Sequence, residues 1–162
     1  MEKIGVMFVC LGNICRSPLA EALFDSKLDE HNLASYFEVE SSGTASYHIG
    51  EVPDERTIAV AKKHNVPLNH RAQQLKKHHF NQFDYVIVMD ESNRSNALDI
   101  APKNTDYELF MMRYFDSVDK GSAVIDPWFG DIDGFEECFQ TLDRSCDGFI
   151  HFLVEKHNLS LS

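Results

Sequence analysis

A cysteine and an arginine that could act on one anion lie close together near the start of the chain. Cys10 and Arg16 bracket a short loop that continues into Ser17, giving the pattern C-x5-R-S. A thiolate is a strong nucleophile, and a guanidinium can hold two oxygens of a tetrahedral oxyanion at once. Backbone amides of a loop that ends at a helix start can cradle the same anion. The pattern therefore predicts in-line attack of Cys10 on a phosphoryl group held by Arg16.

The residues between them suit a tight loop around an anion. We expect Gly12 to supply a positive φ, and Asn13 tolerates that conformation better than most residues. Positive charge beside a thiol favours the thiolate, which is the reactive form of Cys10. The predicted phosphate-binding loop comprises Leu11, Gly12, Asn13, Ile14, Cys15, Arg16 and Ser17. The alternative is a buried structural cysteine, a surface arginine and an ordinary N-cap serine, each of which is common alone.

The segments around this loop predict the elements that position it. A nearly continuous apolar run over residues 4–9 is typical of a strand buried on both faces. Ser17 and Pro18 follow the loop as an N-cap and a first helical residue. Further strands are predicted over 36–40, 84–89 and 106–110, and helices after Asp54, from 91 to about 100, and over 133–157.

Alternating strands and helices form a parallel sheet that is covered on both faces. We therefore predict an α/β fold, a single domain over residues 1–162 with a central twisted parallel sheet of about four strands and helices on both faces. Such sheets bind ligands beyond the carboxyl ends of their strands. The phosphate-binding loop follows the first strand and so lies at such an end.

The composition limits the classes of function. The 162 residues include 26 acidic and 15 basic side chains, a formal net charge of −11, with 43% apolar and 25% charged residues. This profile is that of a globular protein, and its charge argues against binding to nucleic acid or an anionic membrane. No run approaches the ~20 apolar residues of a membrane helix, and the N-terminus lacks the features of a signal peptide.

The four cysteines indicate a reduced protein. Cys10, Cys15, Cys138 and Cys146 do not form a disulfide scaffold in a chain of this length, so we expect a cytoplasmic protein. Their spacing is not that of a zinc site, and no metal or cofactor is expected. The adjacent His78 and His79 are interpreted as solvated rather than as ligands. A monomer is the default.

Asp126 is the candidate proton donor. It follows an apolar stretch and precedes Pro127, Trp128 and Phe129, so we expect it to be buried beside the aromatic rings. A carboxyl group there could protonate a leaving phenolate. A turn-initiating Asp-Pro explains the same residues equally well.

Several segments together resemble the low-molecular-weight protein tyrosine phosphatase family. Residues 9–22, with the sequence VCLGNICRSPLAEA, are similar to its signature loop. The resemblance extends to Ser42-Gly43-Thr44, to Asp54 and Arg56, to His70-Arg71-Ala72, to residues 89–93 and to residues 126–130. It implies hydrolysis of phosphotyrosine in proteins and of small aryl phosphates through a phosphocysteine on Cys10. Asp126 would act first as acid and then as base, and phosphate and other oxyanions would inhibit.

The resemblance also assigns supporting residues. Asn13, Ser17, Ser42 and His70 would brace the loop by hydrogen bonds, and Tyr47, Trp128 and Phe129 would form aromatic walls around a phenyl ring. The alternatives are a solvated loop histidine, a turn serine and a half-buried packing tyrosine. Many members carry two tyrosines after Asp-Pro that can be phosphorylated. Trp128 and Phe129 lack the hydroxyl, so this control is absent, and a nearby Glu51 would disfavour acidic flanking residues in a substrate.

Cys15 shares the loop with the nucleophile. A thiolate is prone to oxidation, and a neighbouring thiol can trap its sulfenic acid as a disulfide. We therefore expect a reversible Cys10–Cys15 disulfide under peroxide. The alternative is that Cys15 is a small core residue.

Two other functions fit the sequence less well than the phosphatase. An arsenate reductase of the same fold needs two further cysteines near residues 80–90, and the segment 82–89 contains none. Cys138 and Cys146 lie on the predicted terminal helix and should face the core. A phosphate-binding module without turnover has no need of Cys10 as nucleophile or Asp126 as acid.

Overall fold

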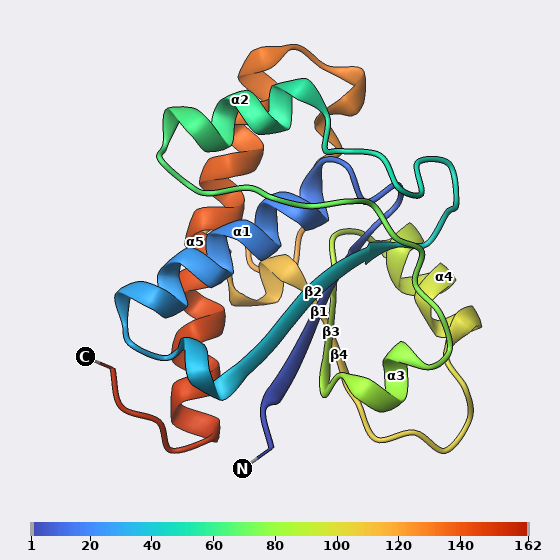
Figure 1. Cartoon of the computed structure of the whole chain (residues 1–162), viewed down its shortest axis with the longest axis vertical. Helices are drawn as coiled ribbons and strands as arrows, with labels where there is room; N and C mark the ends of the chain where they lie inside the picture. Colours follow the sequence, from blue (N-terminus) through green and yellow to red (C-terminus); the bar gives the residue numbers. More distant parts are fainter. Residues whose placement is uncertain (1, 162) are drawn as a thin grey trace.

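One parallel sheet forms the centre of the protein, whose computed structural model describes residues 2–161 (Figure 1). The strands run in the order β2-β1-β3-β4, and each neighbouring pair is parallel. They are β1 (Ile4–Cys10), β2 (Phe37–Gly43), β3 (Tyr85–Val88) and β4 (Glu108–Met111). The prediction of an α/β fold with a parallel sheet of about four strands is therefore confirmed.

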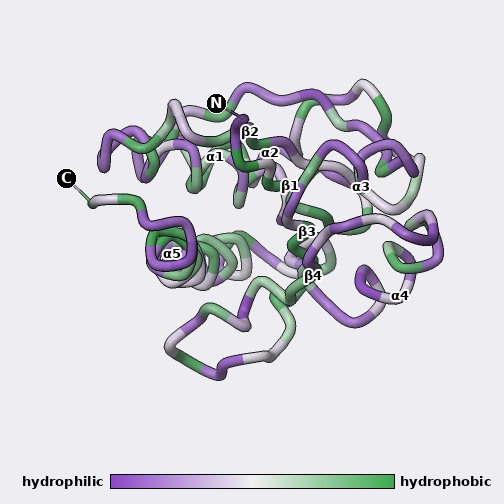
Figure 2. Tube along the Cα trace, turned by 90° about the horizontal axis from the view of Figure 1, so that it is seen from below, coloured by the Kyte–Doolittle hydropathy of each residue, from purple (hydrophilic) through white to green (hydrophobic). Residues whose placement is uncertain are grey.

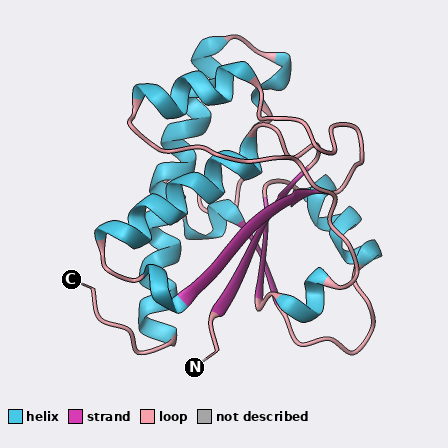
Figure 3. Cartoon of the chain, viewed as in Figure 1, coloured by secondary structure: helices cyan, strands magenta, loops and turns pink. Residues whose placement is uncertain are grey.

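Helices cover both faces of the sheet, as predicted (Figure 3). They are α1 (Arg16–Glu30), α2 (Glu55–Lys63), α3 (His79–Gln82), α4 (Glu91–Ile100) and α5 (Ile132–Lys156), with 3-10 turns at Ala34–Tyr36, Met112–Phe115 and Pro127–Phe129. Helices α1 and α5 pack together on one face with α2 against α5, while α3 and α4 lie on the other. Within residues 2–161, no helix has the length and apolarity needed to span a bilayer.

Strand β1 is apolar throughout because both of its faces are buried. Val6 and Phe8 belong to the core under α1 and α5, whereas Met7 and Val9 belong to the core under α3 and α4. Figure 2 shows apolar residues gathered along β1, β3 and β4, between the two layers of helices. The larger core is rich in aromatic rings. The rings of Phe8 and Phe24, for example, meet edge to face with their centres 5.4 Å apart. This rigid centre fixes the end of β1, where the loop begins.

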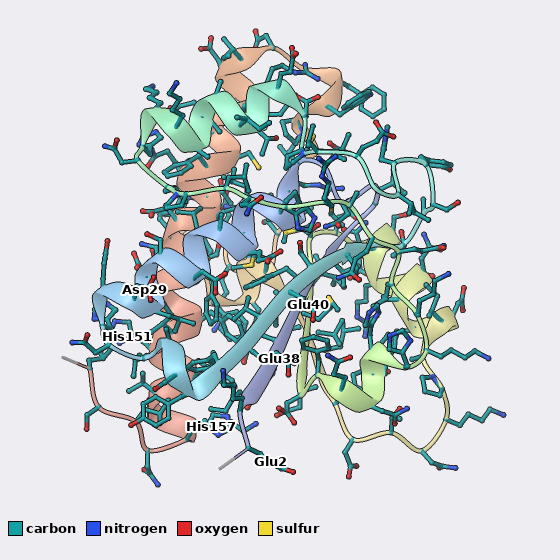
Figure 4. The ribbon with its side chains drawn as sticks, in the orientation of Figure 1. Glu2, Asp29, Glu38, Glu40, His151 and His157 are labelled. Atoms are coloured by element: carbon teal, nitrogen blue, oxygen red, sulfur yellow. The ribbon has the colours of Figure 1, made fainter. Side chains whose placement is uncertain are left out.

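The edge strand β2 carries two acidic side chains. Glu38 and Glu40 lie along the strand (Figure 4) and accept hydrogen bonds from the side chains of Gln82 and Gln73, each at 2.9 Å. Charged side chains on an edge strand oppose pairing with another chain. Strand β2 also continues to Gly43, beyond the predicted end at residue 40, because its backbone stays paired with β1 as far as Cys10.

The predicted helix starts agree with the structure at α2 and α4 but not at α1. Asp54 and Asp90 cap α2 and α4 as expected of aspartates at those positions. The prediction that Ser17 is the N-cap of α1 is wrong, because the helix begins at Arg16 and Cys15 occupies the cap position. Ser17 is instead fully buried inside the first turn, where its hydroxyl faces Cys10.

The prediction that both adjacent histidines are solvated is wrong for His79. His78 is exposed, but His79 is 4% exposed, and its Nδ1 accepts a hydrogen bond from the backbone of Lys76 at 2.9 Å. Burial lowers the pKa of His79 to about 4, so the ring is neutral near pH 7. The short helix α3, which begins at this residue, was not predicted, because one turn is too short to show a periodic pattern.

Candidate active site

The loop between β1 and α1 is held by backbone contacts to the segment 44–54. The carbonyls of Cys10, Leu11 and Ile14 accept hydrogen bonds from the backbone N–H groups of residues 44, 45 and 54, at 2.9 to 3.0 Å. Asn13 has a φ of 58°, which confirms the predicted left-handed conformation at that residue. The same prediction for Gly12 is wrong. A Cβ at this position would lie 3.0 Å from the ring of His48, so a larger residue would require that ring to shift.

A buried chain of hydrogen bonds connects the Cys10 sulfur to His70. The Ser17 hydroxyl lies 3.0 Å from the Cys10 sulfur, and Asn13 Nδ2 donates to the same hydroxyl at 2.8 Å. His70 Nε2 lies 2.7 Å from Asn13 Oδ1, which also accepts from the backbone N–H of Gln73 at 2.9 Å. The structure thus brings together three of the four residues predicted to brace the loop.

The fourth residue predicted to brace the loop, Ser42, takes part through its backbone alone. Its hydroxyl points to the sulfur of Met7 at 3.3 Å, and only its backbone carbonyl reaches the network, by accepting from Ser17 at 3.3 Å. The neighbouring Ser41 makes the predicted kind of contact. Its hydroxyl accepts from Asn13 Nδ2 at 3.0 Å and donates to Glu21 Oε1 at 2.6 Å.

Arg16 is buried at the base of the site, with 2% of its side chain exposed. Its Nη1 donates to Asp90 Oδ2 at 2.7 Å and to the carbonyl of Val124 at 2.9 Å, and its Nη2 lies 3.4 Å from Asp126 Oδ2. Burial alone would lower the pKa of Arg16, but its electrostatic interactions with Cys10, Asp90 and Asp126 raise it above the ordinary arginine value. The guanidinium is therefore a permanent positive charge beside the Cys10 sulfur.

Asp126 begins a 3-10 turn that returns toward the loop. Its Oδ1 accepts from the backbone N–H of Trp128 at 3.0 Å, while its Oδ2 faces Arg16. The side chain is 27% exposed, and Phe129 is 87% exposed. The expectation that both aromatic rings bury Asp126 is therefore wrong for Phe129.

A cavity of about 200 Å³ joins these groups. Its lining residues are Cys10, Leu11, Gly12, Ile14, Cys15, Arg16, Tyr47, His48, Asp126, Trp128 and Phe129. All three predicted aromatic wall residues contribute to it. The nucleophile candidate, the cation and the acid candidate thus face one cavity whose remaining lining is mainly apolar.

The other three cysteines are buried and free. Burial raises the pKa of the Cys15 thiol to about 12, although Cys15 lines the same cavity as Cys10. Burial also raises the pKa of Cys138 to about 12 and that of Cys146 still further, so both are neutral thiols in the core around α5.

Arg56 connects helix α2 to the turn that carries Asp126. Its Nη1 donates to the carbonyl of Gly130 at 3.2 Å and its Nη2 to that of Trp128 at 3.4 Å. The Arg56 guanidinium lies 4.4 Å from the centre of the Phe135 ring and is held by both carboxylate oxygens of Asp54. Arg56 therefore fixes the segment after Asp126 against α2.

Sequence reasoning assigned no role to two residues that the structure places in the site. His48 lines the cavity, with its ring centre 5.9 Å from that of Trp128. Asp90 is the carboxylate partner of Arg16. The position of Asp90 after the buried strand β3 was a usable signal, because carboxyl ends of neighbouring parallel strands meet at one edge of the sheet.

Residues 5–159, nearly all of the chain, match the sequence model described as "Low molecular weight phosphotyrosine protein phosphatase". The chain belongs to this family. Its members are enzymes, and the resemblance carried by residues 9–22 and the later motifs is confirmed.

Named relatives of this phosphatase family cover most of the chain. A low molecular weight phosphotyrosine protein phosphatase of Saccharomyces cerevisiae is 43% identical over 143 residues, which is 86% of this chain and 89% of the relative. The Homo sapiens protein of the same name is 37% identical over 152 residues, 90% of this chain and 93% of the relative. A solved protein tyrosine phosphatase of Entamoeba histolytica superposes with a TM-score of 0.91 at 34% identity, covering 96% of this chain and 99% of that one.

Proposed function

We propose that the protein hydrolyses phosphotyrosine in proteins, and small aryl phosphates, through a phosphocysteine on Cys10. The observation that carries the proposal is the meeting of Cys10, Arg16 and Asp126 in one cavity. The Ser17 hydroxyl lies at the Cys10 sulfur, the Asp90 carboxylate pairs with the Arg16 guanidinium, and the Asp126 carboxyl lines the cavity. Phosphotyrosine-containing proteins or peptides are the proposed partners.

The first chemical step transfers the phosphoryl group to sulfur. The carbonyls of Cys10, Leu11 and Ile14 are engaged by residues 44–54, and the backbone N–H groups of the loop, with the remaining donors of Arg16, would hold the phosphate oxygens. The Cys10 thiolate attacks phosphorus, the bond from phosphorus to the aryl oxygen breaks, and Asp126 gives its proton to that oxygen. The phenol leaves and phosphocysteine remains.

The second step regenerates the enzyme. Asp126, now a carboxylate, takes a proton from a water molecule whose oxygen attacks phosphorus. The sulfur–phosphorus bond breaks, phosphate is released, and Cys10 returns as a thiolate. The Ser17 hydroxyl, 3.0 Å from the sulfur, can donate a hydrogen bond to the thiolate in both steps.

The apolar lining of the cavity supports an aryl rather than an alkyl phosphate. Leu11, Tyr47 and Trp128 offer apolar surface to a phenyl ring, and a phenolate is a far better leaving group than an alkoxide. We expect phosphate release from a phosphotyrosine peptide to exceed release from the matched phosphoserine peptide at least about 100-fold in kcat/KM. Equal rates on the two peptides would contradict the proposed function.

The cellular setting is also a proposal. Four free cysteines are what a reducing compartment maintains, which supports action in the cytoplasm. We propose a single catalytic domain over residues 1–162 that works as a monomer, without metal or cofactor.

Replacing Arg56 with alanine should weaken the acid step more than the attack by Cys10. Loss of the bonds to the carbonyls of Gly130 and Trp128 frees the segment that positions Asp126. We expect kcat to fall about tenfold for phenyl phosphate, whose leaving group needs a proton, and less for p-nitrophenyl phosphate. Arg56→Lys should recover part of the loss.

The matched control for Arg56 is Arg94→Ala on α4, where the guanidinium is exposed and lies 3.9 Å from Glu91. This variant should hydrolyse both substrates at the wild-type rate. An equal loss on both substrates in Arg56→Ala would show that Arg56 supports the fold and does not position Asp126.

Peroxide should produce a reversible disulfide between Cys10 and Cys15. Both thiols line one cavity, and the Arg16 charge favours oxidation at Cys10 first. Peroxide oxidises the Cys10 thiolate to a sulfenic acid, the Cys15 thiol displaces water, and a dithiol reductant restores both thiols. Peptide mapping by mass spectrometry should find the linked pair. Cys10 found only as sulfinic acid or unmodified would contradict the prediction.

A further inference from the structure

Large apolar side chains on the two segments that contribute Tyr47, His48, Trp128 and Phe129 to the cavity are open to solvent. Ile49 and Val52 are 56% and 51% exposed, and Ile125, Phe129 and Ile132 are 79%, 87% and 60% exposed. The first two lie on the segment after β2, and the other three lie on the segment that leads into α5. We call these five residues the apolar rim. Figure 1 places both segments near the end of the sheet where the strands terminate.

The rim is continuous with the cavity. Phe129 belongs to both, and Tyr47 and Trp128 line the cavity while remaining 72% and 41% exposed. The ring of His48 lies between them, with its centre 6.4 Å from Tyr47 and 5.9 Å from Trp128. An extended chain whose aromatic side chain entered the cavity would therefore lay its neighbouring residues on apolar surface.

Both segments of the rim are held by backbone hydrogen bonds. The backbone N–H of Gly50 donates to the carbonyl of Ala72 at 2.8 Å, and the N–H of Ala72 donates to the carbonyl of Glu51 at 2.9 Å. On the other side, the N–H of Val124 donates to the carbonyl of Met89 at 2.8 Å, and Arg56 holds the turn after Asp126. A preformed surface loses little conformational entropy when a partner binds.

Three carboxylates near the rim are each engaged by another side chain. Glu51 lies 3.0 Å from His48 Nδ1, the Asp54 carboxylate is held by Arg56, and Asp126 faces Arg16. The five side chains of the rim are themselves all apolar and exposed. The surface is therefore suited to apolar side chains more than to charged ones.

We propose that the apolar rim binds apolar side chains directly before and after the phosphotyrosine of a substrate. This inference rests on the proposed function, since it makes the peptide around the phosphotyrosine the occupant. A second copy of the chain would bring another net charge of −11, and an anionic bilayer would repel the same charge. Either would also cover the cavity, whereas a substrate peptide arrives with the group that the cavity receives.

The test compares two phosphotyrosine peptides that differ only at the residues beside the phosphotyrosine, isoleucine in one and serine in the other. Burying two such side chains should raise kcat/KM about tenfold for the isoleucine peptide. In the double variant Ile49→Ser with Ile125→Ser the ratio should fall toward one. Leu98→Ser, at an exposed apolar residue of α4, should keep the wild-type ratio.

Hydrolysis of p-nitrophenyl phosphate distinguishes a failure of the rim proposal from a failure of the proposed phosphatase function. This substrate has no flanking residues, so its loss in the wild-type protein would overturn the proposed function itself. Turnover of this substrate by wild-type protein, with equal rates on the two peptides, would overturn the rim proposal alone. Dimers that the double variant dissociates, or cosedimentation of the protein with phosphatidylcholine–phosphatidylserine vesicles, would assign the rim to another occupant and also overturn the proposal.

Discussion

Cys10→Ser is expected to reduce the hydrolysis of p-nitrophenyl phosphate by about 10⁴-fold or more, because the covalent route through sulfur is lost. The serine hydroxyl has the same position as the thiol but remains protonated near pH 7 and is a poor nucleophile. Phosphate binding should survive, since Arg16 and the loop amides are unchanged. The variant should therefore still bind inorganic phosphate, as measured by calorimetry, while its kcat is lost.

The covalent intermediate gives a second readout for Cys10. Acid quenching of wild-type protein during turnover should trap phosphate on the peptide that contains Cys10, and the variant should trap none. The matched control is Cys146→Ser in the core, where the new hydroxyl can donate to the Ala20 carbonyl that the thiol now contacts at 3.8 Å. Cys146→Ser should keep its activity per folded molecule. Equal activity of the wild-type protein and Cys10→Ser would exclude the mechanism.

The sequence predicted the framework of the site because its signals are local. Strand β1 is a continuous apolar run, and α5 carries apolar residues spaced three and four positions apart. Both patterns reflect burial, and burial largely decides whether a segment forms a strand or a helix. The loop from Cys10 to Ser17 combines a strand end, a tight turn and a helix start within a few residues. Its spacing alone therefore brings Cys10 and Arg16 together.

The choice between Ser41 and Ser42 could not be made from sequence. In the register of the sheet, Ser41 pairs with Phe8 and Ser42 with Val9, so the two hydroxyls point to opposite faces. Ser41 shares the face of α1, where Asn13 and Glu21 lie, and Ser42 faces Met7 on the other side. The register depends on pairing between segments far apart in the chain, which two adjacent serines do not encode.

Long-range partners were missed for the same reason. Arg16 meets Asp90 across 74 residues, and Arg56 meets Gly130 across a similar separation. No periodic pattern links such pairs, and only the assembled sheet edge brings them together. The burial of His79 was missed as well. This histidine lies in a basic, polar segment, and its neighbours in sequence do not reveal the packing that buries it.

Asp126→Asn is expected to reduce the release of phenol from phenyl phosphate by about 10²- to 10³-fold. The amide keeps the oxygen that accepts from the Trp128 backbone at 3.0 Å, so the turn should remain in place. It has no acidic proton to give to the leaving oxygen. A nitrophenolate leaves readily without protonation, so its release from p-nitrophenyl phosphate should fall much less.

The rate to measure for Asp126 is the first turnover. The same carboxylate is proposed to activate water in the second step, and slower hydrolysis of phosphocysteine would reduce steady-state rates for all substrates alike. Aryl release in a single turnover isolates the transfer to Cys10, and there the dependence on the leaving group should be steeper in the variant than in the wild type.

Asp131→Asn makes the same chemical change five residues along, and asparagine can still cap α5 as Asp131 does. This control should leave the dependence unchanged. A first-turnover loss of the same size for good and poor leaving groups would mean that Asp126 orients Arg16, 3.4 Å away, and is not the acid.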